Sequence, residues 1–297
     1  MSELLKIVTT QLAEHLRTVM EYRSHESISG GDINQTFILE TSTSEQFFVK
    51  ANRAELLDMF LAEFAALEEI KSSNTLLTPL PILAGSAGDS AFLVMDFIEM
   101  AGASETSEEV LGHGLAEMHK VTKPKFGWDR NNTIGSTKQI NRQESSWGKF
   151  WKDHRIAPQL QWAAQQGAAP SIIENGRQLL AQIESILVDH NTIPSLLHGD
   201  LWGGNWSTTK IGDPIIYDPA LYYGDRETDL AMTELFGGFS NRFYNAYNES
   251  WTLSPGYTSR KDLYNLYHIL NHFNLFGGGY GRQAENLMER ILQNRYQ

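Results

Sequence analysis

The sequence predicts an α+β protein in two parts, a small β-rich part at residues 1–97 and a larger, mainly helical part at residues 98–297. In the first hundred residues, short apolar strands surround one long helical pattern. After Ser107, apolar residues recur mostly at helical spacing to the end of the chain. We expect the hinge between the parts near Asp96–Ala101, directly after an apolar strand.

The composition is that of a folded, acidic protein. Hydrophobic residues make up 41% of the 297 residues, which is enough for a sizeable core. Lys and Arg number 24 against 36 Asp and Glu, and the resulting net charge of −12 argues against broad nucleic-acid or anionic-membrane binding. Because cysteine is absent, disulfides, zinc–thiolate sites and a cysteine nucleophile are excluded.

No segment has the pattern of a targeting or membrane-spanning sequence. Charged residues are spread through Met1–Tyr22, so a signal-peptide core is not expected there. The longest apolar run, Ala91–Met95, is far shorter than the ~20 residues of a membrane helix. We therefore expect a cytoplasmic protein that binds neither membrane nor nucleic acid.

The apolar pattern predicts each element of the first part in turn. These are an amphipathic helix over Leu5–Val19, a hairpin of strands Thr36–Thr41 and Gln46–Ala51, a helix Glu55–Lys71, a loop or edge strand at Thr78–Ala84, and a strand Ala91–Phe97.

The second part is predicted to be helical apart from loops and two short apolar segments. We expect helices at Ser107–Lys120, Trp147–Gln166, Ser171–His190 and from Asp229 onward, a long polar loop at Asn131–Ser146, and short apolar segments at Ser195–Leu197 and Ile215–Tyr217. The run Gly277–Gly281 lies between helical patterns and should be an interhelical turn.

The strongest chemical signal lies between the two short apolar segments. His198, Asp200 and Asn205 have the spacing H-x-D-x-x-x-x-N, and Asp218 follows the second segment. In phosphoryl transfer one Asp orients the attacking hydroxyl, while an Asn and a second Asp hold Mg²⁺ on the nucleotide phosphates. Each residue alone is typical of a turn. Their joint spacing favours a kinase-like site.

The first part offers a second component of such a site. Lys50 ends the apolar run Phe47-Phe48-Val49, and Glu63 lies on the apolar face of the following helix. A carboxylate on an apolar face needs a cationic partner, and Lys50 is the nearest well-placed candidate. Upstream, Gly30 and Gly31 could let backbone N–H groups approach phosphate oxygens, although a two-glycine turn before a strand is also ordinary.

These residues lie within longer motifs that resemble the fructosamine kinase (ketosamine-3-kinase) family, which is related to aminoglycoside and choline phosphotransferases. The most specific stretches are Leu197–Trp206 (LHGDLWGGNW) and Ile216–Phe239, and Asn132–Thr137 and Trp147–Leu160 are also similar. The resemblance covers nearly the whole chain. It implies a bilobal protein-kinase-like fold with ATP in the cleft between a β-rich N-lobe and a helical C-lobe.

The resemblance also implies a role for each matching residue. Asp200 would be the catalytic base; Asn205 and Asp218 the Mg²⁺ ligands; Lys50, paired with Glu63, a contact of the ATP phosphates; Asp96, Phe97 and Ile98 the hinge that meets adenine through its backbone; and His198 and Asp229 supports of the catalytic loop.

The implied activity is transfer of the ATP γ-phosphoryl group to the sugar 3-hydroxyl of a ketosamine, in deglycation of proteins or amino acids. The acceptor would be a small-molecule or protein-bound fructosamine, ribulosamine or psicosamine, and the protein a monomer. The alternatives are a kinase of another small alcohol, such as an aminoglycoside or choline, and a catalytically silent kinase-like binding protein. Trp202 is expected either to stack on the acceptor sugar or to anchor the core.

Overall fold

The computed structural model describes residues 1–28 and 33–293. They form two compact units, unit 1 (Met1–Ser107 and Ser207–Pro219) and unit 2 (Glu108–Trp206 and Ala220–Gln297). The later segment Ser207–Pro219 therefore groups with N-terminal residues. A division into domains at residue 97 stays a prediction.

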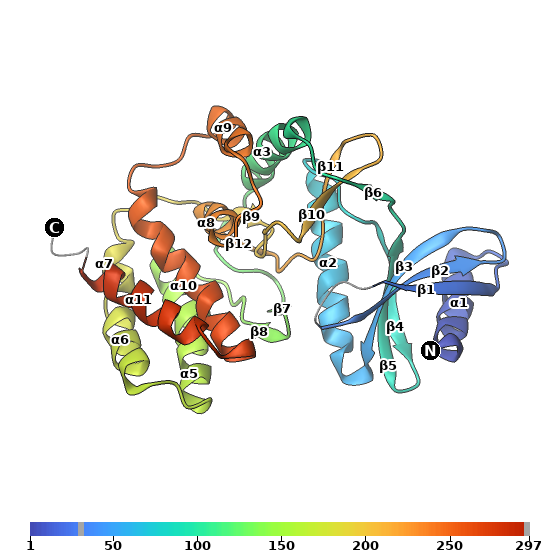
Figure 1. Ribbon diagram of the computed structural model, residues 1–297, viewed down its shortest axis with the longest axis horizontal. Helices are drawn as coiled ribbons and strands as arrows, with labels where there is room; N and C mark the ends of the chain where they lie inside the picture. The colour runs from blue at the N-terminus through green and yellow to red at the C-terminus, as the bar shows by residue number, and fades with distance from the viewer. Residues whose placement is uncertain (29–32, 294–297) are drawn as a thin grey trace. The chain divides into compact units, whose positions relative to one another are not determined.

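Unit 1 is built on a five-stranded antiparallel sheet (Figure 1). The strand order is β1 (Tyr22–Ile28), β2 (Gln35–Thr41), β3 (Gln46–Arg53), β5 (Ser90–Asp96) and β4 (Pro81–Ala87). Helices α1 (Ser2–Leu16) and α2 (Leu57–Ser73), the latter preceded by the short helix η1 (Ala54–Leu56), lie on opposite faces of this sheet.

The alternation of side chains along β3 decides which residues face each helix. Val49 and Ala51 share a core cluster with Leu5, Val8 and Leu12 of α1. The neighbouring positions of β3 point the other way, because successive strand residues alternate between the two faces. Phe48 accordingly packs in the cluster that contains Phe60 and Leu67 of α2. Lys50 lies on this second face.

A smaller sheet in unit 1 brings a distant segment next to the N-terminal residues. Its strand order is β11 (Pro214–Ile216), β10 (Trp206–Thr209) and β6 (Met100–Ala101). Ile216 N–H also donates to Leu77 O at 3.0 Å. These bonds hold β11, the strand that precedes Asp218, in unit 1.

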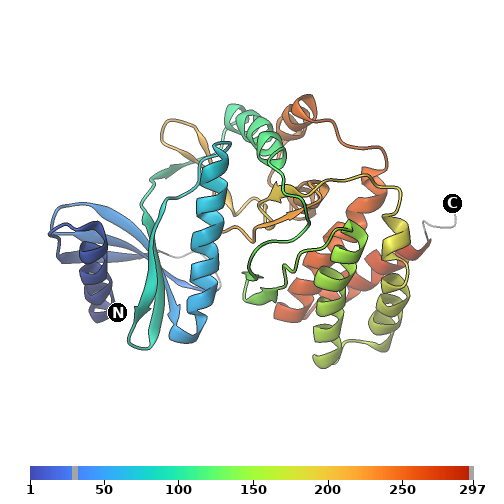
Figure 2. The same ribbon diagram turned by 180° about the vertical axis from the view of Figure 1, so that it is seen from behind.

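Unit 2 is mainly helical (Figure 2). Its helices are α3 (Glu105–His119), α4 (Trp147–Trp151), the π-helical segment η2 (Lys152–Ile156), α5 (Ala157–Gln165), α6 (Pro170–Leu180), α7 (Ile183–Ile186), α8 (Glu227–Leu235), α9 (Asn241–Ser250), α10 (Tyr257–Phe276) and α11 (Tyr280–Gln293). Helix α10 packs against α5, α8 and α11, and α11 packs against α6. Two short antiparallel pairs complete the unit, β7 (Asn132–Ile134) with β8 (Thr137–Gln139) and β9 (Ser195–Leu197) with β12 (Tyr222–Gly224).

Most predicted elements are present, and the differences have local causes. The predicted hairpin is β2–β3, and Thr78–Ala84 overlaps the edge strand β4. Strand β1 escaped prediction because most of its side chains are exposed and show no apolar alternation. The first helix ends at Leu16, where Arg17 adopts a left-handed conformation, and Val19 lies beyond it with 90% of its surface exposed. The predicted helix at Trp147–Gln166 contains the π-helical segment η2, and the predicted loop at Asn131–Ser146 contains β7 and β8.

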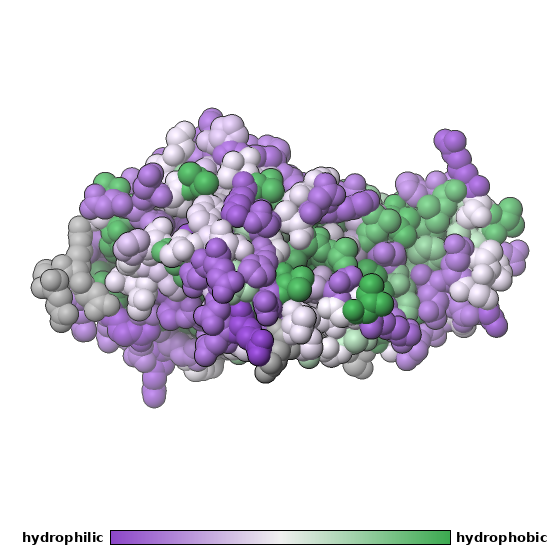
Figure 3. Space-filling model, turned by 90° about the horizontal axis from the view of Figure 1, so that it is seen from above, coloured by the Kyte–Doolittle hydropathy of each residue, from purple (hydrophilic) through white to green (hydrophobic). Residues whose placement is uncertain are grey.

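The described part of the chain contains no helix with the length and apolar character needed to cross a membrane. The face drawn in Figure 3 is largely hydrophilic, with apolar side chains gathered in patches.

We predict that Gly112→Ala destabilises unit 2. A Cβ at Gly112 in α3 would lie 2.4 Å from Phe243 O of α9 and 3.1 Å from Tyr247 N, so the helices would have to separate. Overpacking of this kind typically costs ~1–3 kcal/mol, more than alanine gains over glycine in a helix. Thermal unfolding should show a melting temperature lower by several degrees.

The matched control is Gly102→Ala, where an added Cβ has nothing within 4 Å. This variant should melt within about one degree of the parent. Equal melting temperatures for Gly112→Ala and the parent would contradict the close α3–α9 contact.

Candidate active site

Lys50 of β3 is bonded to two carboxylates within unit 1. Its Nζ lies 2.5 Å from Glu63 Oε1 of α2 and 2.5 Å from Asp218 Oδ1, after β11. The pairing with Glu63 is the one that the helix face predicts. The second partner, Asp218, is a residue that the sequence proposes as a metal ligand, so a single lysine joins two of the predicted site residues.

The burial of these groups differs in a way that matters for binding. Lys50 and Glu63 have little exposed surface, whereas 47% of the Asp218 side chain is exposed. Burial by itself would lower the pKa of Lys50, but the carboxylates of Asp218 and Glu63 outweigh it and raise that pKa above its ordinary value. Lys50 is therefore a permanent cation. Asp218 uses Oδ1 for this ion pair, and Oδ2 is the atom through which it could hold a cation.

The backbone at Asp218 is in the left-handed region, with φ 58°. Among the described non-glycine residues with positive φ, Arg17 and Asn74 end helices and Ser44 lies in the β2–β3 turn. Asp218 neither ends a helix nor lies in a hairpin turn. A strained conformation without a structural cause is typical of functional residues, because the surrounding fold must maintain it.

The predicted catalytic loop of unit 2 follows β9 and is fixed through its backbone. Both His198 N–H and Gly199 N–H donate to the carboxylate of Asp229, at 2.7 Å and 2.8 Å. Gly199 has φ +83°, and a Cβ there would lie 2.1 Å from Ala220 O. Only glycine fits this position. The path of the chain into Asp200 is thus set by one buried carboxylate and one close backbone contact.

Asp200 and Asn205 lie together at the two ends of this loop. Asn205 Nδ2 donates to Asp200 O at 2.8 Å and approaches Asp200 Oδ2 at 3.3 Å. Because the amide nitrogen makes these bonds, Oδ1 is the atom of Asn205 with the chemistry of a cation ligand. Asp200 is half-buried.

Trp202 is 41% exposed, which excludes the core-anchor alternative. Its indole covers Gly204, where a Cβ would come within 2.4 Å of the ring. Gly203 lies against Gly238, because a Cβ added at Gly238 would lie only 3.0 Å from Gly203 Cα. The loop thus presents a flat apolar ring at its surface and packs through its glycines.

An aromatic cluster that the sequence did not indicate combines a residue just before Gly238 with residues at the end of α10 and the start of α11. Its members are Phe236, His272, Phe276 and Tyr280, with His272 at the centre and ring centroids 4.9–5.7 Å from the others. Phe236 and Phe276 are exposed. A run of aromatic residues carries no sign of burial or exposure, so this outcome required the structure.

The other predicted site residues lie at the end of β5 and in the glycine-rich segments. Asp96 ends β5, and its Oδ1 accepts from Leu80 N–H at 2.6 Å, while Phe97 and Ile98 follow it half-buried. Gly30 and Gly31 lie outside the described residues. The run Gly277–Gly281 contains the turn between α10 and α11, as predicted.

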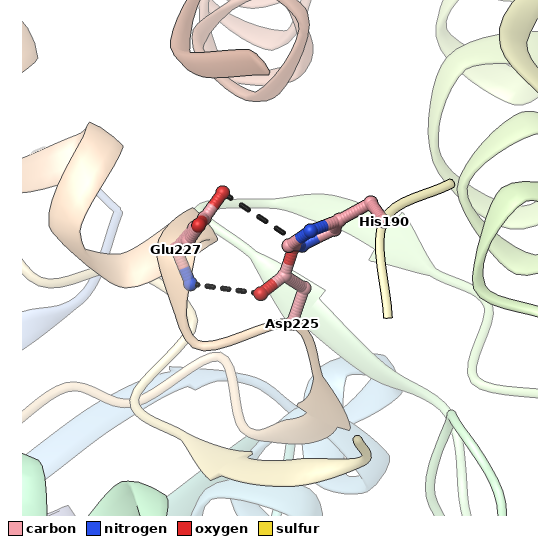
Figure 4. Close-up of side chains that lie close together, drawn as sticks. All are labelled: His190, Asp225 and Glu227. Carbon is pink, nitrogen blue, oxygen red and sulfur yellow. Dashed lines mark hydrogen bonds and ion pairs between the residues drawn. The ribbon is translucent and has the colours of Figure 1, made fainter. Parts of the chain in front are cut away.

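A separate cluster of His190, Asp225 and Glu227 offers three ligand atoms that all lie within 4.8 Å of one another (Figure 4). These groups already have partners. Arg260 donates two hydrogen bonds to Glu227, at 2.7 and 2.8 Å, and Tyr264 donates one to Asp225 at 2.5 Å. With His190 bonded to Asp225 at 2.6 Å, the cluster is a buried ion-pair network at the start of α8.

The fold is that of the protein-kinase-like phosphotransferases. The same fold occurs in a choline kinase from Streptococcus pneumoniae, with a TM-score of 0.65 at 17% identity over 98% of this chain and 100% of that chain.

Closer matches identify the family. The model of the fructosamine kinase family matches residues 4–294, and the chain belongs to this family. A probable ketoamine kinase of Synechocystis sp. is 40% identical over 290 residues, which is 96% of each chain. The chloroplastic protein-ribulosamine 3-kinase of Arabidopsis thaliana is 40% identical over 270 residues, 90% of this chain and 82% of that protein. The crystal structure of a candidate fructosamine-3-kinase from Haemophilus somnus has a TM-score of 0.89 at 29% identity over 96% of each chain. The resemblance read from the motifs is confirmed.

We predict that Lys50→Met destabilises the protein more than Glu63→Gln does. The methionine leaves Glu63 as a buried carboxylate without a cation, a change that typically costs ~3–5 kcal/mol. In Glu63→Gln, by contrast, Lys50 keeps Asp218 as a partner. Thermal unfolding at pH 8 should show the larger loss for Lys50→Met.

The pH dependence separates this cause from a loss of packing. Without Lys50, burial raises the folded-state pKa of Glu63 above its unfolded value, so the penalty is present at high pH and fades as falling pH protonates Glu63. The difference in melting temperature between the two variants should narrow from pH 8 to pH 5. A difference that does not change with pH would contradict the charge argument.

Proposed function

We propose that this protein is an ATP-dependent ketosamine 3-kinase, which phosphorylates the 3-hydroxyl of a sugar joined to an amine. The observation that carries the proposal is the arrangement of Lys50 with two carboxylates, Glu63 and Asp218. Family membership over residues 4–294 and relatives named ketoamine kinase and protein-ribulosamine 3-kinase support this substrate class.

Asp200 is the residue proposed to act on the acceptor. Its carboxylate accepts a hydrogen bond from the sugar hydroxyl, orients the oxygen toward the γ-phosphorus of ATP, and takes the proton as the new P–O bond forms. The bond from the γ-phosphorus to the bridging oxygen breaks, and ADP leaves with the electron pair. The loop that holds Asp200 is fixed through Asp229, so little reorganisation is required.

Asn205 and Asp218 are proposed to hold Mg²⁺. Both offer an oxygen, and Mg²⁺ prefers few protein ligands of this kind beside phosphate oxygens and water. When bound with ATP, the ion would neutralise charge on the phosphates. Lys50 binds phosphate oxygens as a fixed cation, and Glu63 keeps it in place. The backbone of Asp96–Ile98 is proposed to meet adenine, and Gly30 and Gly31 the phosphates.

Trp202 is proposed to bind the acceptor. Its exposed indole offers a flat apolar face to the C–H groups of a sugar ring. A ketosamine also carries a protonated amine, and a cation near an aromatic face gains ~0.5–2 kcal/mol. We further propose that the protein works as a cytoplasmic monomer on a free or protein-bound ketosamine.

A substrate panel tests the proposal. ADP release is measured with fructosyl-, ribulosyl- and psicosyl-amines, and with choline and an aminoglycoside as the competing acceptors. Turnover that depends on a ketosamine, with a phosphorylated product seen by mass spectrometry, is the expected result. Turnover of choline or an aminoglycoside alone would assign another small-alcohol kinase, and ATP binding without any turnover would assign a silent binding protein.

Asp200→Asn should remove turnover and leave ATP affinity nearly unchanged. The amide keeps the shape of the side chain and cannot take the proton, and general-base catalysis is typically worth ~10²–10⁴-fold. Single-turnover assays and nucleotide titration measure the two quantities separately. If the variant kept near-full activity, Asp200 would not be the base.

Trp202→Ala should raise KM for the ketosamine or lower kcat, with KM for ATP and the melting temperature almost unchanged. Trp202→Phe should be intermediate, because it keeps an aromatic ring and loses the N–H donor. Steady-state kinetics with each substrate varied in turn distinguishes these effects. Loss of ATP affinity equal to the loss of ketosamine affinity would contradict the acceptor role.

A further inference from the structure

The carboxylate of Asp229 has a third donor besides the two backbone N–H groups of the catalytic loop. His119, at the end of α3, places Nε2 at 3.1 Å from Asp229 Oδ2. The other ring nitrogen, Nδ1, lies 2.8 Å from Tyr247 Oη of α9. Arg226 Nη1 in turn lies 3.0 Å from that same phenol oxygen. Three side chains distant in sequence therefore form a line that ends at Asp229.

The chemistry of the four groups fixes the direction of the two outer hydrogen bonds in this line, and the direction of the Tyr247–His119 bond then depends on the protonation of the ring. Arg226 can only donate, so the Tyr247 oxygen accepts from it. The phenol proton is then available for His119 Nδ1. Asp229 can only accept, because burial, which alone would raise its pKa, is outweighed by the bonds from His119 and Gly199, which lower that pKa. His119 Nε2 must therefore carry a proton.

His119 could satisfy this requirement as the neutral Nε2–H tautomer or as the imidazolium. The ring is fully buried, and this burial lowers its pKa below the ordinary value although the Asp229 bond acts in the opposite direction. The charge of Arg226 adds to the lowering. The imidazole is therefore neutral, with its proton on Nε2 and its lone pair on Nδ1 directed at Tyr247.

Arg226 is anchored independently of this line. Its guanidinium donates to Trp251 O at 2.8 Å and to Thr252 O at 2.6 Å, and it lies 4.0 Å from the centroid of the Trp251 ring. Its position is thus determined by the chain after α9. It cannot turn toward another acceptor without losing these bonds.

We propose that Arg226, Tyr247 and His119 are positioning residues, a directional hydrogen-bond relay that orients Asp229 and, through it, the backbone of His198 and Gly199 before Asp200. Each member acts through the next one, and none touches a substrate. The kinetic part of this inference rests on the proposed function, since it assumes that the loop places a catalytic base.

The first test reads the tautomer directly. In protein labelled with ¹⁵N-histidine, two-bond ¹H–¹⁵N correlations distinguish the two neutral tautomers and the imidazolium. The His119 signals are assigned by their loss in His119→Gln. The relay requires a neutral Nε2–H ring at pH 7. A Nδ1–H tautomer or an imidazolium there overturns it.

The second test removes one hydroxyl from the line. Tyr247→Phe deprives His119 Nδ1 of its donor, so the ¹⁵Nδ1 resonance should move and kcat should fall by about tenfold or more, since small misplacements of a reacting group carry such losses. KM for ATP should stay unchanged. The matched control is Tyr244→Phe on the same helix, whose hydroxyl donates to Thr233 Oγ1 at 3.2 Å, away from Asp229.

A pair of histidine variants covers the case in which Tyr247→Phe does not fold. His119→Gln keeps a side-chain N–H for Asp229 and should retain more kcat than His119→Leu, which has none. His113→Gln is the control on the same helix, where Nδ1 contacts Ser250 Oγ at 2.8 Å. Equal losses of kcat in His119→Gln and His119→Leu, or in the two tyrosine variants, would overturn the relay.

The outcomes separate this inference from the proposed function. The tautomer is read without substrate, so an inactive substrate panel with the Nε2–H form would refute the kinase assignment and leave the hydrogen-bond relay intact. A wrong tautomer in a protein that turns over ketosamines would refute the relay alone.

Discussion

The carboxylate of Asp229 is the group on which the catalytic loop depends. It is an ionised group in the interior, and such a group is tolerated only when its oxygens are fully bonded. Here the donors are the backbone N–H groups of His198 and Gly199 together with the ring of His119. Two of these donors are backbone groups of the loop. Asp229 is therefore stabilised as a carboxylate only when the loop adopts the conformation that places both N–H groups against it.

The same constraint operates in unit 1 with the opposite sign of charge. Lys50 is a buried cation, and its two partners come from α2 and from the segment after β11. A buried charge whose partners lie on different elements ties those elements together. In each unit, therefore, a buried charge that supports the proposed site would be costly to bury without the correct fold.

Local patterns explain how much of this arrangement the sequence could predict. The hairpin, the long helix and the apolar face that carries Glu63 are periodic features within a few residues of one another, so they predicted the Lys50–Glu63 pair. The spacing from His198 to Asn205 is likewise local. The side chains of the line that ends at Asp229 are not: His119, Tyr247 and Arg226 come from α3, α9 and the residue before α8, with no repeating spacing between them. Such contacts depend on helix packing, which a single sequence does not encode in any short pattern.

The exposure of individual side chains was the second property that the apolar periodicity of the sequence could not predict. Trp202 follows Asp200 in a loop, where no repeat separates an inward from an outward side chain, and both its alternatives stood until the structure showed the exposed ring. Strand β1 was missed for the related reason that an exposed edge strand needs no apolar alternation. The cluster in Figure 4 also combines distant residues, His190 and the start of α8.

The start of α8 shows why so many charges can be buried close together. Asp225, Arg226, Glu227 and Asp229 are nearly inaccessible, yet all are bonded to other segments of unit 2. Asp225 is bonded to His190 and to Tyr264 of α10, Glu227 to Arg260 of α10, Arg226 to the chain after α9, and Asp229 to the catalytic loop. Apolar residues of the same volume could stabilise such a helix as well or better. They would, however, allow it to rotate or slide against its neighbours, because apolar contacts are not directional. A set of directional bonds in several directions permits one orientation only, and the role proposed for Asp200, which is to hold a carboxylate within hydrogen-bond reach of a hydroxyl, requires that restriction.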